Sequence, residues 1–300
     1  MRLATSSNIV CERPDGSVFS LEKTLQLASA AGFRVFDISF YDWSLPHSPF
    51  LGDGWEAWIN GVAEEAARLG VVFGQCHAYT YPFLSSAVTE EQRARHEELL
   101  ERSLYCCRVL GSKLCVTHPD TDRTAVDWLS ASRRKNSEYM KRLLDRALHY
   151  DMELAVENMC DYSIAPLRKF FSQPEEIVDF LRDFNDDRLG LCWDFEHADI
   201  MQLPQRDALL YMRRYLKATH VSDTHSTVDD TLMHVMPLFG TVDWRSVMRT
   251  LHEIGYQGDF CLEAHNYANR LPDPLIPTAL QLSHEIGTYL LSLAEEEAGL

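Results

Sequence analysis

The sequence predicts an α/β protein built as a single (β/α)8 TIM barrel, with all 300 residues in one domain. Eight short apolar segments alternate with longer segments whose apolar residues recur at helical spacing. The short segments, such as LGLCW and FCLEA, are apolar on both faces. This is typical of parallel strands covered by helices on one side and by a packed barrel interior on the other. Side chains able to bind metal stand at several downstream strand ends, which all meet at one mouth of such a barrel.

Cap and turn residues mark the elements in the first half of the chain. Ser20 is a helix N-cap residue, and Gly32 is a C-terminal stop for the same helix. Thr89 and Gln92 have the spacing of a capping box. In chain order we expect strand 3–10, helix 21–31, strand 34–40, helix 55–69, strand 71–77, helix 89–111 and strand 112–118.

In the second half we expect a loop at 119–135, long enough to be functional, followed by a helix capped by Asn136. Pro174 fits the first position of a later helix. The remaining expected elements are helix 136–150, strand 153–158, helix 174–184, strand 189–195, helix 205–215, strand 217–223, helix 243–255, strand 259–264 and helix 275–297. The alternative fold, an open doubly wound sheet, usually carries a phosphate loop after its first strand, and neither GxGxxG nor GxxxxGK[ST] occurs here.

The composition limits the partners of the protein. Hydrophobic residues make up 46% of the chain, and 45 acidic against 28 basic side chains give a formal net charge of −17. Such a charge disfavours nucleic acid and anionic membranes, which usually bind basic surfaces. The N-terminus MRLATSSNIV has no long apolar region, and no later segment is apolar for eighteen residues in a row. We therefore expect neither a signal peptide nor a membrane span, and a cytoplasmic location.

Eight cysteines occur without a CxxC pair, so the sequence shows no structural zinc motif. Cys76, Cys115, Cys192 and Cys261 lie in strand-like apolar segments, where a free thiol behaves as a small core residue. We expect reduced, buried thiols.

Four side chains at the ends of the last four expected strands suit a metal ion: Glu157, Asp194, His220 and Glu263. A buried glutamate is unfavourable unless it is paired or bound to metal, and these strand ends supply only Lys217 as a nearby cation. Three carboxylates and one imidazole suit one divalent ion, such as Mn²⁺, Co²⁺, Mg²⁺ or Zn²⁺. The alternative is a salt-bridge network without metal.

Further histidines follow the same strands. We expect His77, His118, His197 and His234 to line the same mouth outside the four-ligand set, where they would bind substrate or hold further metal. His225 and His265 are left without an assigned role, because a lone histidine near a strand end is more often a hydrogen-bonded structural residue than a ligand.

The strand-end motifs resemble those of the xylose-isomerase-like barrel superfamily. They are Glu157-Asn158, Asp194 with His197, His220 with Asp223, Gly240-Thr241-Val242-Asp243-Trp244, and Glu263. The superfamily includes sugar and sugar-phosphate isomerases and epimerases, inosose dehydratase and endonuclease IV. The resemblance implies that the four residues above are metal ligands, and that Glu157 and Glu263 are a catalytic acid/base pair acting through an enediolate. It also implies that His197 binds substrate, which would be a small carbohydrate. Assembly into a homo-oligomer is left open.

Two departures keep other functions open. Ser226 replaces the arginine that follows the metal-binding histidine in ketose 3-epimerases, so the resemblance does not specify a ketohexose. Endonuclease IV uses histidines like His77 and His118 for zinc, but Leu232 replaces the aspartate that binds its third zinc together with the counterpart of His234. The alternatives are thus an endonuclease IV-like zinc phosphodiesterase, an inosose dehydratase-type lyase, and a barrel that binds a ligand without catalysis.

Loop residues were also considered as substrate contacts. The basic run Arg133-Arg134-Lys135 is either a clamp for a substrate phosphate or a solvated helix start. Several aromatic residues in the expected loops could stack on a sugar ring or pack within a lid: Tyr41, Trp43, Tyr79, Tyr81 and Phe83.

Overall fold

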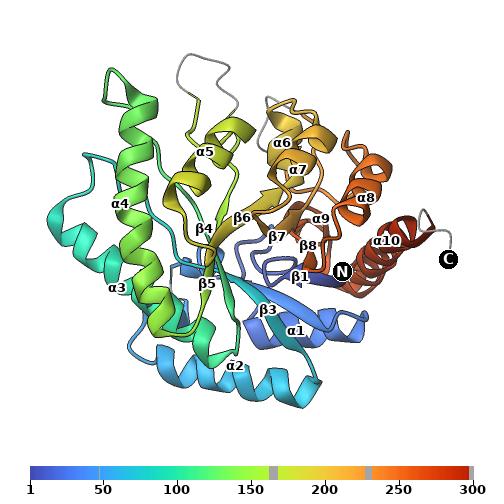
Figure 1. The fold of residues 1–300 in the computed structure, drawn as a ribbon. Coiled ribbons are helices and arrows are strands. Elements are labelled where there is room, and N and C mark those ends of the chain that lie inside the picture. The colour runs from blue at the N-terminus through green and yellow to red at the C-terminus, as the bar shows by residue number, and fades with distance from the viewer. Residues whose placement is uncertain (47, 162–167, 227–231, 297–300) are drawn as a thin grey trace.

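Eight parallel strands close into a single barrel in the order β1 to β8, with β1 paired to β8 (Figure 1). The computed structural model describes all residues except 47, 162–167, 227–231 and 297–300. The strands are β1 (Arg2–Ser6), β2 (Val35–Ser39), β3 (Val72–His77), β4 (Leu114–Thr117), β5 (Glu153–Glu157), β6 (Leu189–Asp194), β7 (Leu216–Val221) and β8 (Asp259–Leu262). The predicted barrel is confirmed.

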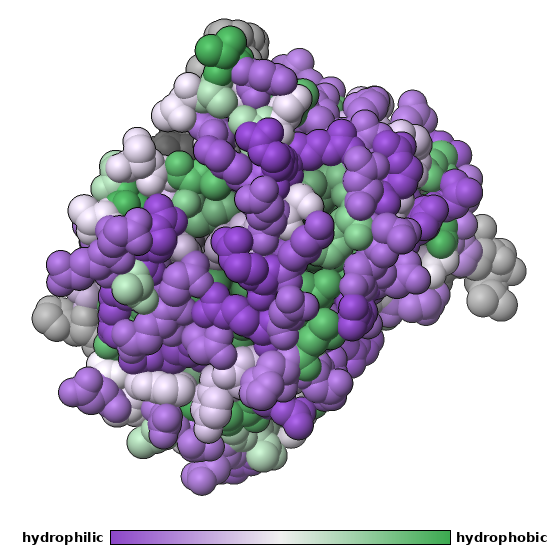
Figure 2. All heavy atoms as spheres, turned by 60° about the vertical axis from the view of Figure 1, so that its left-hand side comes forward, coloured by the Kyte–Doolittle hydropathy of each residue, from purple (hydrophilic) through white to green (hydrophobic). Residues whose placement is uncertain are grey.

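Helices surround the barrel (Figure 1). They are α1 (Leu21–Ala30), α2 (Trp55–Leu69), α3 (Glu90–Val109), α4 (Trp128–His149), α5 (Pro174–Phe184), α6 (Phe195–Ile200), α7 (Gln205–Met212), α8 (Trp244–Glu253), α9 (His265–Ala268) and α10 (Ile276–Glu296). The Ser20 side chain accepts a hydrogen bond from the Lys23 amide, and Thr89 with Gln92 forms the predicted capping box. Figure 2 turns the side of α3 and α4 forward, and hydrophilic residues predominate there around small separate apolar patches. Among the described residues, no helix is both long and apolar enough to cross a membrane.

Every second residue of a strand faces the barrel interior, and this alternation decides which way the side chains at the strand ends point. On β5, Leu154 and Val156 belong to the large core between strands and helices, whereas Ala155 packs with Cys192 and Ala218 in a separate small cluster. Because side chains alternate along a strand, a residue two positions downstream of an interior residue also faces the interior. The small interior residues of β5, β6 and β7 therefore lie one layer below the strand ends at the mouth.

Two short helices were not predicted, and both begin at the mouth. Helix α6 follows β6 directly, and the Asp194 side chain caps it by accepting a hydrogen bond from the His197 amide at 2.8 Å. Helix α9 begins at His265, directly beyond β8. The aspartate thus holds the histidine three residues later at a fixed place beside the end of β6.

Helix α4 begins eight residues before the predicted start, at Trp128, and Asp127 caps it. Asn136 is therefore not an N-cap; it is buried inside the helix. Its Oδ1 accepts a hydrogen bond from the Asp120 amide at 2.9 Å, and its Nδ2 donates one to the Asp120 carbonyl at 2.7 Å. The Asn136 side chain therefore makes hydrogen bonds to the backbone of the loop at Asp120 and not to the first turn of the helix. The local sequence pattern does not reveal this contact.

The basic run lies within this helix and is engaged in ion pairs. Arg133 pairs with Asp183, and Lys135 pairs with Asp122 at 2.6 Å. The ammonium of Lys135 lowers the pKa of the Asp122 carboxyl, and the hydroxyl of Thr124 adds to the effect. These contacts favour the reading of the run as part of a solvated helix.

We expect Asn136→Ala to lower the free energy of unfolding by about 1–3 kcal/mol, because it leaves the buried amide and carbonyl of Asp120 without partners. Glu138→Ala on the exposed face of the same helix is the matched control, expected within about 0.5 kcal/mol of the parent. Urea unfolding of the two variants measures the difference. Equal midpoints and slopes would contradict the role given to Asn136.

The prediction of reduced thiols is wrong for one pair. Cys76 on β3 and Cys107 on α3 form a disulfide, with Cα atoms 6.2 Å apart. Cys76 lies between Gln75 and His77 on β3, on the face of the strand that packs against the helices. The two residues are 31 positions apart, and only the packing of α3 on β3 shows that they meet. The six other cysteines are free and buried.

Candidate metal centre

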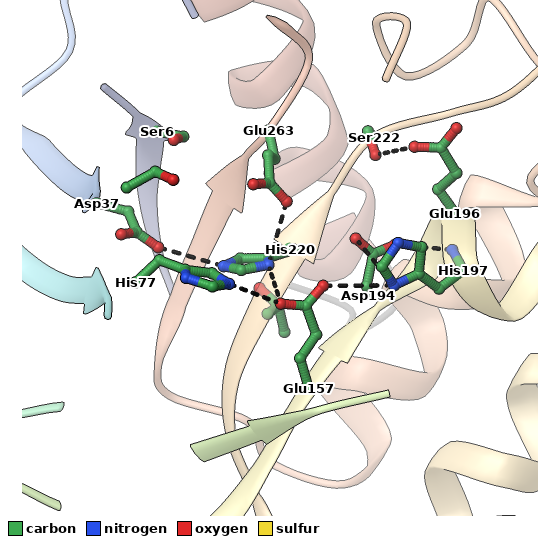
Figure 3. A network of polar contacts seen from close by, with 12 residues as sticks. Ser6, Asp37, His77, Glu157, Asp194, Glu196, His197, His220, Ser222 and Glu263 are labelled. Carbon is green, nitrogen blue, oxygen red and sulfur yellow. Dashed lines mark hydrogen bonds and ion pairs between the residues drawn. The ribbon is translucent and has the colours of Figure 1, made fainter. Parts of the chain in front are cut away.

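The four predicted ligands converge at the mouth of the barrel (Figure 3). Glu157, Asp194, His220 and Glu263 each offer one ligand atom, and these atoms all lie within 4.8 Å of one another. All four residues are buried. The cause is the period of two along each strand, because each residue stands two positions beyond a small buried residue on its strand, namely Ala155, Cys192, Ala218 and Cys261.

The donor atoms fit a divalent cation. His220 Nδ1 lies 3.1 Å from Glu157 Oε2 and 3.1 Å from Glu263 Oε2. In the described part of the chain, His220 Nδ1 and Asp194 Oδ2 are buried without a hydrogen-bond partner. An unpartnered buried polar atom is unfavourable by about 1–3 kcal/mol. A cation at the centre of the four groups would accept lone pairs from both atoms and balance the carboxylate charge.

Asp37 on β2 orients the His220 ring by contacting Nε2, the ring nitrogen that faces away from Glu157 and Glu263 (Figure 3). Its Oδ2 lies 3.2 Å from His220 Nε2 and accepts a hydrogen bond from Gln75 Nε2 at 2.8 Å. A carboxylate that accepts a hydrogen bond from the N–H of one ring nitrogen fixes the tautomer in which the other nitrogen is free to bind metal. The sequence analysis does not identify Asp37, although one acidic residue within the apolar run VFDIS is a signal that could have marked it.

We expect Asp37→Asn to weaken divalent-metal affinity about 10–100-fold, because the neutral amide holds the His220 ring and its tautomer less firmly. Asp179→Asn, on the outer helix α5, is the matched control and should bind metal like the parent protein. Competition with a fluorescent chelator measures both. Equal affinities for the two variants would show that Asp37 does not act on His220.

Three of the predicted histidines surround Glu157. His77 Nε2 and His118 Nε2 lie 2.9 Å apart, and they are 3.3 Å and 3.1 Å from Glu157 Oε2. Together with Glu157 they form a second group whose ligand atoms lie within 4.8 Å of one another. His197 Nδ1 lies 2.7 Å from the Asn158 carbonyl oxygen and 3.3 Å from Glu157 Oε1. Glu157 is therefore shared by the candidate metal centre and a cluster of imidazoles.

His234 lies further out and is held by Glu196, a residue that the sequence analysis does not single out. Glu196 is fully buried; it accepts hydrogen bonds from Ser222 Oγ at 2.5 Å and from the His234 amide at 2.9 Å. His234 has a left-handed backbone with φ 53°, and its ring centroid lies 6.4 Å from that of His197. The ring also stacks on His265 at 4.1 Å. No group of three potential ligands in the described residues includes His234.

Burial and mutual charge set the protonation of the centre without metal. Burial raises the pKa of Glu263 to about 8 and raises the pKa of Asp194 above its usual value. Burial has the same effect on Glu157, but the imidazoles of His220 and His118 outweigh it and hold its pKa well below the usual range. Burial opposes a charge on His220, yet the neighbouring acidic groups Cys192, Glu263 and Glu157 raise its pKa well above normal. Near pH 7 the metal-free centre thus carries protons on His220 and Glu263.

We expect metal binding to release protons and to strengthen between pH 6 and pH 8, because a cation must displace the protons on His220 and Glu263. Each displaced proton changes the apparent affinity by about tenfold per pH unit below the pKa of its group. Calorimetric titration in buffers of different ionisation enthalpy counts the released protons. A titration without proton release, or with affinity independent of pH, would contradict these protonation states.

A cavity of about 520 Å³ lies next to the centre and has His118 and His197, the neighbours of Glu157, in its wall. The loop aromatics divide into two kinds. Trp43, Tyr79 and Tyr81 are buried, and their polar atoms are engaged: the Tyr79 hydroxyl lies 2.7 Å from His96 Nδ1, and Tyr81 donates to Glu97. Phe83 is buried against Tyr139. Tyr41 and Tyr81 both line the cavity, and of the two only Tyr41, at 56%, is exposed.

Comparison with known proteins defines the fold relationship. The family model described as xylose isomerase-like TIM barrel matches residues 25–286. The uncharacterized protein y4fM of Sinorhizobium fredii (strain NBRC 101917 / NGR234) is 23% identical over 244 residues, which cover 79% of this chain and 68% of that protein.

Two solved structures superpose over almost the whole chain. A D-tagatose 3-epimerase-like protein has a TM-score of 0.76 and 19% identity, covering 99% of this chain and 100% of its own. The IOLI protein, solved with a zinc atom, has a TM-score of 0.74 and 18% identity, covering 99% of both chains. At these identities the likeness shows the shared fold.

Proposed function

The chain belongs to the xylose isomerase-like TIM barrel family, and from that premise we propose that it is a metal-dependent isomerase or epimerase of a sugar, sugar phosphate or keto-cyclitol. The observation that carries the proposal is the buried set of Glu157, Asp194, His220 and Glu263, in which two ligand atoms have no hydrogen-bond partner among the described residues. The D-tagatose 3-epimerase-like structure supports the substrate class, and the zinc in the IOLI structure supports a divalent ion.

The two glutamates are placed for proton transfer. Glu157 and Glu263 approach His220 Nδ1 from opposite sides, each at 3.1 Å (Figure 3). A bound divalent ion supplies Lewis-acid polarisation of a carbonyl. One glutamate removes the proton from the carbon beside the carbonyl, and the bonding pair moves toward the carbonyl oxygen to give an enediolate. The other glutamate returns a proton to the opposite face, which inverts the carbon.

The imidazoles beside Glu157 would orient substrate hydroxyls. His118 is the most accessible of the three, with 28% of its side chain exposed, and burial lowers its pKa to about 4. A neutral imidazole both donates and accepts a hydrogen bond, which suits a hydroxyl group. The absence of arginine at Ser226 leaves the identity of the sugar open within this class.

A substrate screen tests the proposal. Ketoses, their phosphates and inososes are incubated in D₂O with the protein and Mn²⁺, Co²⁺, Mg²⁺ or Zn²⁺, and products are followed by NMR. Deuterium at a carbon-bound position of a converted sugar is the expected result and identifies the reacting carbon. Failure of every compound to exchange with every metal would overturn the proposal.

A second candidate function is hydrolysis of a phosphodiester by more than one zinc ion, as in endonuclease IV. The group of His77, His118 and Glu157 favours it, because it offers a second metal position that shares Glu157 with the first. The formal charge of −17 disfavours a nucleic-acid substrate. Asp229 and Asp230, the acidic residues nearest to His234 in the sequence, lie outside the described residues. Metal counting separates the candidates: one ion per chain favours a sugar, and two or more zinc ions with cleavage of abasic DNA favour hydrolysis.

A further inference from the structure

A second cavity adjoins the one next to the metal centre. Its volume is about 660 Å³, and it lies among the chain segments that follow β1, β2 and β8, with Asn8, Asp42 and His265 in its wall. Tyr41 lines both cavities and is 56% exposed. One exposed aromatic ring therefore stands between two hollows that open on the same mouth of the barrel.

Asn8 carries an unsatisfied polar atom at the second cavity. The residue is only 3% exposed. Its Nδ2 donates to Asp42 Oδ2 at 2.6 Å and lies 3.3 Å from His265 Nδ1, while its Oδ1 has no hydrogen-bond partner in the described part of the chain. A buried amide oxygen without a partner is unfavourable, so the cavity offers an acceptor for a hydroxyl group of a ligand.

The wall chemistry favours a neutral polyhydroxylated group. The carboxylates of Glu12 and Asp42 balance the cations of Arg13 and Arg270 along this wall. The Arg13 guanidinium is buried; its terminal nitrogens donate to the carbonyl oxygens of Ala268 at 3.3 Å and Asn269 at 2.7 Å and pair with Asp273 at 3.2 Å, so these nitrogens are already engaged. Amide, carboxylate and imidazole groups beside an aromatic face match the alternating hydroxyls and apolar faces of a sugar ring.

The size of the mouth points to a ligand larger than one sugar. Each cavity falls within the range of about 300–1,000 Å³ that is usual for a small-molecule site. One sugar that reacts above the metal centre would contact only the first of them. The second cavity has different lining residues, among them Asn8 with its unpartnered Oδ1. These residues would have no role in a reaction on a single monosaccharide.

We propose that the substrate is a glycoside, whose reacting sugar lies above the metal centre and whose second sugar ring crosses Tyr41 into the cavity lined by Asn8, Asp42 and His265. The proposal rests on the proposed function for the identity of the reacting ring. The second cavity determines specificity for the attached ring and takes no part in proton transfer.

Binding of unmodified sugars tests the inference without turnover. D-glucose, maltose, cellobiose and trehalose are titrated into the protein by calorimetry. We expect at least one disaccharide to bind at least tenfold more tightly than D-glucose. Ser44→Trp fills the second cavity from its wall and should reduce this preference to less than twofold. Asn8→Ala should weaken the disaccharide more than D-glucose, because it removes the unpartnered acceptor.

The matched control is Ser292→Trp on the outer helix α10. Ser44 and Ser292 both donate a hydrogen bond to the carbonyl three residues earlier, so the two substitutions break equivalent contacts at different places. Ser292→Trp should keep the disaccharide preference. Equal or absent binding of every disaccharide, or a preference that survives Ser44→Trp, overturns the inference. Turnover of a free ketose without a disaccharide preference would support the proposed function and overturn this inference. A disaccharide preference without turnover of any ketose would support the second sugar site and contradict the proposed function.

Discussion

Glu157→Gln is expected to abolish metal retention and turnover together, with a loss in kcat of at least about 10³-fold. Glu157 belongs to the four-residue centre and also to the group with His77 and His118, and its Oε2 lies within 3.3 Å of nitrogen atoms of His77, His118 and His220. The amide has the same shape but cannot supply the negative charge that holds a cation, nor accept a proton from carbon. Metal content by plasma emission spectroscopy and deuterium exchange of a converted sugar measure the two losses.

The same strand supplies the control. Glu153 stands at the opposite end of β5, where it pairs with Lys217 at 2.6 Å on the surface. Glu153→Gln should retain metal and activity, with a stability change of about 1 kcal/mol or less because exposed ion pairs contribute little. A Glu157→Gln protein that keeps both its metal and its turnover would remove Glu157 from the centre.

Glu263→Gln should slow proton exchange from one epimer of the substrate by at least about 10²-fold and affect the other epimer, whose proton Glu157 removes, much less. The reason is that each glutamate faces one side of the reacting carbon, as their approach to His220 from opposite sides indicates (Figure 3). Deuterium wash-in is measured from each epimer separately, with metal content recorded for each variant, since both residues are also proposed ligands.

A mechanism with a single catalytic base predicts a different result for Glu263→Gln. If one glutamate works alone on one face, Glu263→Gln will leave exchange unchanged in both epimers while metal is retained, and aldose–ketose isomerisation will be favoured over inversion. If both variants exchange at the parent rate, the two-glutamate mechanism is wrong. Glu153→Gln again serves as the parent-like reference, because its carboxylate lies at the far end of the barrel strand.

The convergence of the four candidate ligands could be predicted because it depends on two local rules. Strands of a parallel barrel all end at the same mouth, and side chains alternate along each strand. Residue type and strand position therefore place Glu157, Asp194, His220 and Glu263 together, as the structure does. The barrel itself follows from the same alternation of apolar strand and amphipathic helix.

Features that depend on contacts between distant segments could not be predicted. Asn136 has the side chain of a helix cap, but its amide pairs with the Asp120 backbone, so α4 begins earlier. Asp37 matters because β2 brings it behind His220, and the two residues are 183 positions apart. The Cys76–Cys107 disulfide forms because α3 packs on β3.

The sequence by itself thus determined the barrel and the set of carboxylates and imidazoles at its mouth. Only the tertiary structure decided which side chains support them and how large the mouth is. The physical reason is that strand period and residue chemistry are local properties of the chain. Hydrogen bonds such as those of Asn8 and Glu196, and the cavities beside them, exist only where separate loops pack together.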